Sequence, residues 1–218
     1  MKFTLLILFL LLPLCSSQAQ SSGSRCITSH TAPPANSYYW PPDAKVKVYF
    51  HRAMFTAPER ETLLATIKDW SKIAHTTGTG VEFTYGGEID GIIDCANCLR
   101  VTRREVHRND RKHYAFFYPL KLDRDGLLLS ARIDLDFGTT SPEALQAFMA
   151  HELGHGMGLW DCATCKKKKT IMTGFPGVNR DNGLLRPSEC DLEVVKEIYE
   201  VRRRLKNNSL AENVKGQQ

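Results

Sequence analysis

The sequence predicts an α+β domain, in which short β-strands and amphipathic helices share one core. Segments of alternating polar and apolar residues, typical of strands, occur before residue 90 and again after residue 98. Three other segments begin with helix-capping residues and continue with apolar residues at helical spacing. The second of these helices contains most of the residues that indicate a function.

The first residues have the form of a secretory signal peptide. Lys2 precedes an apolar run from Phe3 to Leu14, and small residues follow up to Ala19. The run is about 12 residues long, too short for the ~20 that span a bilayer. We therefore expect residues 1–19 to be removed from a secreted protein, extracellular or periplasmic, with no membrane insertion after signal cleavage. A lipoprotein modified at Cys15 is the alternative, although Leu14 is a poor residue before a lipidated cysteine.

The remaining chain suits one domain and excludes some partners. Of 218 residues, 199 follow position 19, enough for a full hydrophobic core. Removing Lys2 leaves 28 of the 29 Lys and Arg residues against 24 Asp and Glu, an excess too small to predict a nucleic-acid partner. We expect an irregular N-terminal segment over 20–40, a monomeric catalytic domain over 41–205 and a polar C-terminal tail over 206–218.

Two strands and one helix are predicted before residue 90. Lys45 to Phe50 alternates polar and apolar residues, as a half-buried strand does. Thr56-Ala57-Pro58-Glu59 is a capping box with a proline in the first turn, which predicts a helix to about His75. A second strand should run from Val81 to Tyr85 and end at Gly86-Gly87.

Three more strands are predicted in the middle of the chain. The first runs from about Leu99 to Val106. Tyr114–Leu122 and Leu127–Phe137 then form a hairpin, because Asp123-Arg124-Asp125-Gly126 between them is typical of a turn.

Charged residues near these strands are expected to be solvated. Asp134 and Asp136 alternate with apolar residues, and we expect both to face solvent. The run from His107 to His113 has a high charge density and predicts a solvated loop. A second metal site in this run is the alternative, but neither a structural Ca2+ nor a second Zn2+ has further support in the sequence.

The motif that indicates a function is His151-Glu152-Leu153-Gly154-His155. Thr140-Ser141-Pro142-Glu143 begins the helix that contains it. Residues four apart lie on the same face of a helix, so His151 and His155 can bind one metal ion. Glu152 points about 100° away around the helix. From there its carboxylate can reach a water held by the metal and act as general base.

A third ligand follows the motif. Catalytic zinc usually has three protein ligands and one open position. Gly158 can adopt the positive φ that ends a helix in a sharp turn. That turn would bring the carboxylate of Asp161 back to the two histidines. Met172, in Thr170-Ile171-Met172-Thr173-Gly174, is expected to form an apolar floor beneath them, because a thioether is a poor zinc ligand.

The pattern H-E-x-x-H-x-x-G-x-x-D followed by a methionine resembles the metzincin clan of zinc proteases. The segment Ser130–Met172 looks most similar to matrixin-type domains, particularly short secreted microbial ones in which Cys-x-x-Cys follows the third ligand. Most metzincins have histidine at the position of Asp161, but the snapalysin-like members use aspartate. The residue Gly174 stands where some metzincins have a tyrosine, so we assign no side chain to stabilise the oxyanion.

The resemblance implies a metzincin-type fold and a peptide substrate. It implies a twisted, mostly parallel sheet with Tyr114–Leu122 as the antiparallel edge strand, an active-site helix, a Met-turn at Met172 and a C-terminal helix from Pro187 to about Leu205. An extended peptide could add to the exposed edge strand. Residues Gly174–Val178 would line a substrate pocket. Glu189 is a less favoured third ligand, because a downstream glutamate belongs to another zinc-protease class.

These features predict a secreted endopeptidase with one catalytic Zn2+, bound by His151, His155 and Asp161, and with Glu152 as the general base. Its partners would be protein or peptide substrates. One alternative is a catalytically silent secreted binding module on the same fold. Another is an interaction domain stabilised by a metal at the two C-x-x-C pairs.

Six cysteines remain after signal cleavage, and an even number in an exported chain favours disulfides. We expect one local bridge in each C-x-x-C, Cys95–Cys98 and Cys162–Cys165, and a long bridge from Cys26 to Cys190. A structural zinc bound by the four C-x-x-C thiolates is the alternative. The surroundings of Cys26 do not resemble the matrixin latency motif, so we expect this cysteine to be structural.

Overall fold

The computed structural model describes residues 38–91, 95–105, 107–108, 111–112, 114–162, 165, 170–173 and 185–215. The predicted signal peptide, Cys26 and the predicted pocket segment Gly174–Val178 lie outside these residues. No helix within them is both long and apolar enough to cross a membrane.

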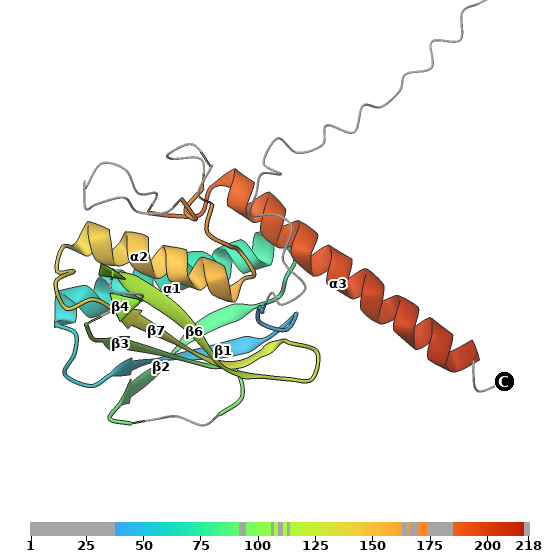
Figure 1. Cartoon of the computed structure of the whole chain (residues 1–218), viewed down its shortest axis with the longest axis horizontal. Coiled ribbons are helices and arrows are strands. Elements are labelled where there is room, and N and C mark those ends of the chain that lie inside the picture. Colours follow the sequence, from blue (N-terminus) through green and yellow to red (C-terminus); the bar gives the residue numbers. More distant parts are fainter. Residues whose placement is uncertain are drawn as a thin grey trace, which may run out of the picture.

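A five-stranded, mostly parallel sheet forms the centre of the protein (Figure 1). Its order is β2-β1-β3-β7-β6, and only β6 is antiparallel to its neighbour. The prediction of an antiparallel edge strand at residues 114–122 is therefore confirmed. The strands are β1 (Lys45–His51), β2 (Glu82–Ile89), β3 (Cys98–Arg103), β6 (Ala115–Leu122) and β7 (Leu128–Leu135).

Two helices pack on one face of this sheet. Helix α1 (Ala57–Thr76) contacts β2, and α2 (Pro142–Gly156) contacts β6 and β7. They also contact each other, and the indole N–H of Trp70 in α1 donates a 3.0 Å hydrogen bond to the carbonyl of Ala150 in α2. Helix α3 (Glu189–Lys215) lies at the end of this layer (Figure 1). The apolar side chains of β1, β3 and β7 that point toward α1 and α2 are almost fully buried.

Three element boundaries differ from the prediction. Strand β2 continues through Gly86-Gly87, where the register with β1 shifts by one residue. A Cβ atom at Gly86 would lie only 2.6 Å from the ring of Tyr49, so a side chain at this position would clash with that ring. The two glycines therefore allow a β-bulge within the strand rather than end it. Helix α3 extends ten residues beyond the predicted end at Leu205, to Lys215. Strand β3 ends at Arg103, before the predicted Val106.

Two predictions about charged residues were wrong. The segment after β3 contains a short antiparallel ribbon, β4 (His107–Arg108) and β5 (Arg111–Lys112), rather than only a loop. Asp134 and Asp136 are buried, not solvent-facing. Asp134 is held by arginines and a threonine on the far face of the sheet, and Asp136 accepts a 2.8 Å hydrogen bond from the backbone of Gly138. The alternation of polar and apolar residues showed which side chains share a face of the strand, but it did not show that other side chains bury the polar face.

Candidate metal centre

Helix α2 positions the candidate ligands, and its sequence explains where it begins and ends. The Ser141 hydroxyl accepts a 3.2 Å hydrogen bond from the backbone N–H of Ala144, and Pro142 occupies the first turn. At the other end Gly158 has a φ of 91°, which strains residues with a side chain. A Cβ at this position would also lie 3.3 Å from Ile198. The chain therefore leaves α2 in a sharp turn.

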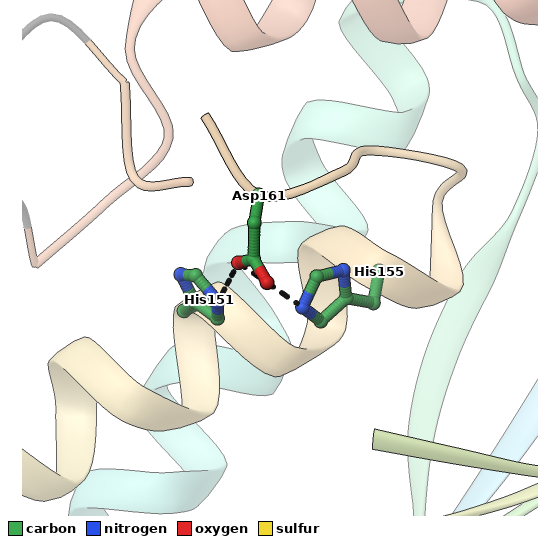
Figure 2. A group of neighbouring side chains, drawn as sticks. All are labelled: His151, His155 and Asp161. Atoms are coloured by element: carbon green, nitrogen blue, oxygen red, sulfur yellow. Dashed lines mark ion pairs between the residues drawn. The ribbon is translucent and has the colours of Figure 1, made fainter. Parts of the chain in front are cut away.

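That turn brings Asp161 to the two histidines of α2. Its Oδ1 atom lies 3.1 Å from Nε2 of His151 and 3.7 Å from Nε2 of His155 (Figure 2). One ligand atom from each residue lies within 4.8 Å of the others, and no other such group of His, Cys, Asp or Glu occurs among the described residues. The structure thus brings together the three residues that the sequence predicts as metal ligands.

Backbone carbonyl groups orient both imidazoles. Nδ1 of His151 lies 2.8 Å from the carbonyl oxygen of Ile171, and Nδ1 of His155 lies 2.9 Å from that of Leu159. These acceptors place the ring proton of each neutral histidine on Nδ1 and leave the Nε2 lone pairs directed toward Asp161. Two imidazole nitrogens and one carboxylate are a ligand set that suits Zn2+.

Glu152 is buried beside the ligand group. Its side chain is 5% exposed, and among the described residues its Oε2 atom has no hydrogen-bond partner. That oxygen lies 4.0 Å from Nε2 of His155. Burial raises the pKa of the Glu152 carboxyl to about 7, although the charge of His151 and a hydrogen bond from the backbone of Phe117 lower it in part. A carboxylate with one unsatisfied oxygen and a pKa near neutrality can accept a proton from a neighbouring water.

The two histidines differ in pKa although they lie one helical turn apart. Burial lowers the pKa of His151, but the hydrogen bond to Asp161 and the charges of Glu152 and Asp161 outweigh it and raise the pKa to about 9. Burial and the charge of His151 lower the pKa of His155 to about 4. A metal must therefore displace a proton from His151 but not from His155, so metal affinity should fall as the pH decreases.

Met172 lies beneath α2, against Gly154. Its side chain is fully buried, and a Cβ at Gly154 would come within 2.7 Å of its sulfur. The backbone N–H of Cys162 donates a 2.7 Å hydrogen bond to the carbonyl of Met172. The segment after Asp161 and the turn containing Met172 are thereby joined under the histidines.

Sequence analysis missed the role of Asp191 in positioning this turn. Asp191 is fully buried, and its carboxylate accepts hydrogen bonds from the Thr170 hydroxyl and, at 3.0 Å, from the backbone N–H of Ile171. The carbonyl of Ile171 is the group that orients His151. Asp191 also forms a capping box with Ser188, which is visible in the sequence as S-x-x-D. The pattern marks the start of α3 but does not show that the same carboxylate reaches residues 170–171.

Replacing Asp191 with alanine should therefore affect both stability and metal binding. The change leaves the buried N–H group of Ile171 and the half-buried N–H group of Ser188 without acceptors, which should lower the free energy of unfolding by about 3 kcal/mol. Zinc affinity should fall roughly 10–100-fold, the usual cost of losing support behind a ligand. Chemical denaturation and competition with a zinc chelator measure the two effects.

Glu189→Ala is the matched control, since Glu189 is exposed in the same first turn of α3. It should change neither quantity, and zinc loss in this variant would instead support Glu189 as a ligand. Unchanged zinc affinity in Asp191→Ala would show that Asp191 does not position His151.

The cysteines form local bridges. Cys95–Cys98 and Cys162–Cys165 are each disulfide-bonded, as expected for the C-x-x-C pairs. Among the described residues, the four cysteines do not converge into a four-thiolate site. Cys190 is also disulfide-bonded, while its predicted partner Cys26 lies outside the described residues. The second bridge closes directly after Asp161 and restrains the loop that supplies this ligand.

An aromatic cluster flanks the ligand group on the side of the edge strand. The ring of Tyr38 stacks on Phe117 of β6, with 5.7 Å between centroids, and lies 6.1 Å from the ring of Trp160. Phe117 in turn lies 6.4 Å from His155. Sequence analysis treated residues 20–40 only as an irregular segment and so missed this contact.

Comparison with known proteins gives a likeness of fold. No protein-family model and no curated protein matches the chain. It is similar to archaemetzincin from Methanopyrus kandleri, with a TM-score of 0.42 and 14% identity, over 70% of this chain and 94% of that chain. It is also similar to metalloproteinase-II from Bacteroides fragilis, with a TM-score of 0.46 and 9% identity, over 79% of this chain and 59% of that chain. The function is therefore argued from the residues of the site.

Proposed function

We propose that this protein is a secreted zinc-dependent endopeptidase of metzincin type. The main support is the convergence of His151, His155 and Asp161 beside the buried carboxyl group of Glu152. A structural helix does not require a buried and a half-buried histidine that are both oriented by backbone carbonyls. A partly unsatisfied buried carboxyl next to them has a cost in stability, and such costs are typical of catalytic sites.

His151, His155 and Asp161 would hold the zinc ion. When bound there, zinc lowers the pKa of a water molecule and polarises the carbonyl group of the scissile peptide bond. Glu152 would accept a proton from a water molecule at Oε2, because this oxygen has no hydrogen-bond partner among the described residues and the pKa of the carboxyl, about 7, is matched to neutral pH. The same carboxyl then gives the proton to the departing amine.

Strand β6 provides a surface on which a substrate can align. It is one of the two edge strands of the five-stranded sheet and, among the described strands of that sheet, the one that runs antiparallel to its neighbour. A hydrogen bond from its residue Phe117 to Glu152 places the strand directly beside the general base. An extended peptide that pairs with the edge of β6 would therefore lie across the ligand group, which favours unfolded or looped polypeptide as substrate.

The finer parts of the proposal rest on the sequence. These are removal of residues 1–19 on export, a domain over 41–205, a Met-turn at Met172, one catalytic Zn2+ and a monomeric protein. The aspartate ligand and the C-x-x-C after it favour a matrixin-like enzyme with a snapalysin-like third ligand. Neither feature requires a second metal ion.

Removal of the metal tests this function. The mature protein should bind one zinc ion per chain and cleave casein, lose both after treatment with a strong chelator, and regain both when zinc is returned. His155→Ala should bind little zinc and remain inactive after the same addition. Cleavage that persists without zinc would contradict the proposal. Stoichiometric zinc with no cleavage of any unfolded protein would favour the silent binding module.

A further inference from the structure

The sheet has a second face, opposite to the one that α1 and α2 cover (Figure 1). We call it the open face. It is formed by the side chains that alternate with the core residues of each strand. Among the described helices, those that contact the sheet, α1 and α2, lie on the opposite face. One row crosses four neighbouring strands in register: Tyr49 of β1, Arg100 of β3, Arg132 of β7 and Tyr118 of β6.

Two arginines on the open face, Arg132 and Arg104, share the buried carboxylate of Asp134, and Arg100 lies next to Arg132 on the neighbouring strand. Oδ1 of Asp134 lies 2.8 Å from Nε of Arg132 and accepts a 2.8 Å hydrogen bond from the Thr102 hydroxyl. Oδ2 lies 3.7 Å from Nε of Arg104. Arg100 pairs in register with Arg132 and donates a 3.1 Å hydrogen bond to the carbonyl of Gly91. Within the part of the chain that the structure describes, Arg100 has no carboxylate partner and Arg104 lies 3.7 Å from the carboxylate that Arg132 also contacts, so these three guanidinium groups carry more charge than Asp134 neutralises.

The excess charge has a cost that a bound anion would remove. Side chains of like charge directly opposite each other on neighbouring strands repel. Burial, and after it the charge of Arg132, lower the pKa of Arg100, and the Nε atom of Arg100 has no hydrogen-bond partner among the described residues. Arg100 also lines a small hollow with Tyr49, Leu120 and Ser130. Guanidinium groups at such a site match the geometry of a carboxylate.

The three arginines are not equally available to a ligand. Arg132 is 18% exposed, because its guanidinium group stacks on the ring of Tyr118 at 4.5 Å and pairs with Asp134. Arg104 is 54% exposed, and Arg100 is half-buried at the edge of the hollow. Arg132 therefore holds the cluster together, while Arg100 and Arg104 are the more accessible to solvent.

We propose that the open face binds an acidic segment of polypeptide, anchored by the guanidinium groups of Arg100 and Arg104. Strand β6 connects this face to the metal centre, because Tyr118 lies on the open face and the preceding residue, Phe117, lies beside His155. A substrate strand paired with the edge of β6 would direct every second side chain to the side of the open face, and the polypeptide that continues from it could cross β7 to reach β3. The choice of polypeptide as ligand rests on the proposed function, whereas anion binding rests on the arginine cluster alone.

A binding experiment without turnover tests this site. The intact protein with Glu152→Ala should bind a fluorescent oligoglutamate peptide, measured by anisotropy. Adding Arg100→Gln and Arg104→Gln should weaken binding about tenfold, since each exposed ion pair contributes a factor of roughly three. Asp134 keeps its contacts with Arg132 and Thr102 in this variant. Lys68→Gln with Lys72→Gln, on α1, removes the same charge from the opposite side and should have less than a twofold effect.

Crosslinking gives a second measurement that does not depend on the variants. An oligoglutamate peptide with a photoreactive end group should attach to β3 or β6, and attachment to α1 or α3 would overturn the proposal. Equal weakening in the two double variants would show an effect of net charge alone and would also overturn it. Tighter binding of heparin than of oligoglutamate at the same residues would overturn the choice of polypeptide. Absence of casein cleavage by the parent would contradict the proposed function without changing these binding results.

Discussion

Replacing Glu152 with glutamine is expected to reduce kcat for peptide hydrolysis by about 10²–10⁴-fold, the range that a general base contributes. Glutamine has nearly the shape of glutamate and can still accept the hydrogen bond from the backbone of Phe117, but it cannot take a proton. Zinc content should stay at one ion per chain, because the three converging ligands are unchanged. Steady-state cleavage of a fluorogenic peptide and metal analysis on the same preparations give both quantities.

A control on the same helix separates this effect from a general loss of charge. Glu143 is exposed in the first turn of α2, so Glu143→Gln should retain the rate of the parent. A Glu152→Gln variant that cleaves within threefold of the parent rate would show that another group accepts the proton. Loss of zinc together with activity would instead make Glu152 a structural support of the ligand group.

The parts of the site that are local in sequence could be predicted from it. His151, Glu152 and His155 lie within two turns of one helix, so helical geometry alone places them relative to one another. Asp161 could be predicted because a positive-φ glycine between it and the helix leaves few paths for the chain. The edge strand could be predicted only through the resemblance, since alternation does not determine the order or direction of strands.

Features that depend on contacts distant in sequence were not predictable. Asp191 lies 20 residues from Ile171, and nothing in S-x-x-D indicates that its carboxylate reaches beyond its own helix cap. Asp134 has the alternation of a solvent-facing residue, yet strands β3 and β7 bring Thr102, Arg104 and Arg132 to it. A glycine pair such as Gly86-Gly87 commonly ends a strand, but here the missing side chain of Gly86 leaves room for the ring of Tyr49 from the neighbouring strand. In each case the deciding neighbour comes from another segment of the chain.

Replacing Asp161 with alanine is expected to lower zinc affinity by more than about 100-fold, because even groups that only support a ligand contribute 10–100-fold. Casein cleavage should fall in proportion to the zinc that is lost and recover in part when zinc is in large excess. Asp161 is 67% exposed, so its removal should disturb the core little, and the folded state should persist by circular dichroism. Chelator competition across a range of zinc concentrations measures the change in affinity.

Replacing the same residue with histidine tests why this position is an aspartate. A neutral ligand gives less negative charge to zinc than a carboxylate, so a water at the metal should lose its proton at lower pH. The Asp161→His variant should therefore retain zinc and show an acidic limb of kcat/KM that moves toward lower pH relative to the parent. An acidic limb that does not move would show that the charge of the third ligand does not control this titration and that Glu152 does. A variant that binds no zinc would show that the turn at Gly158 fits a short carboxylate but not an imidazole.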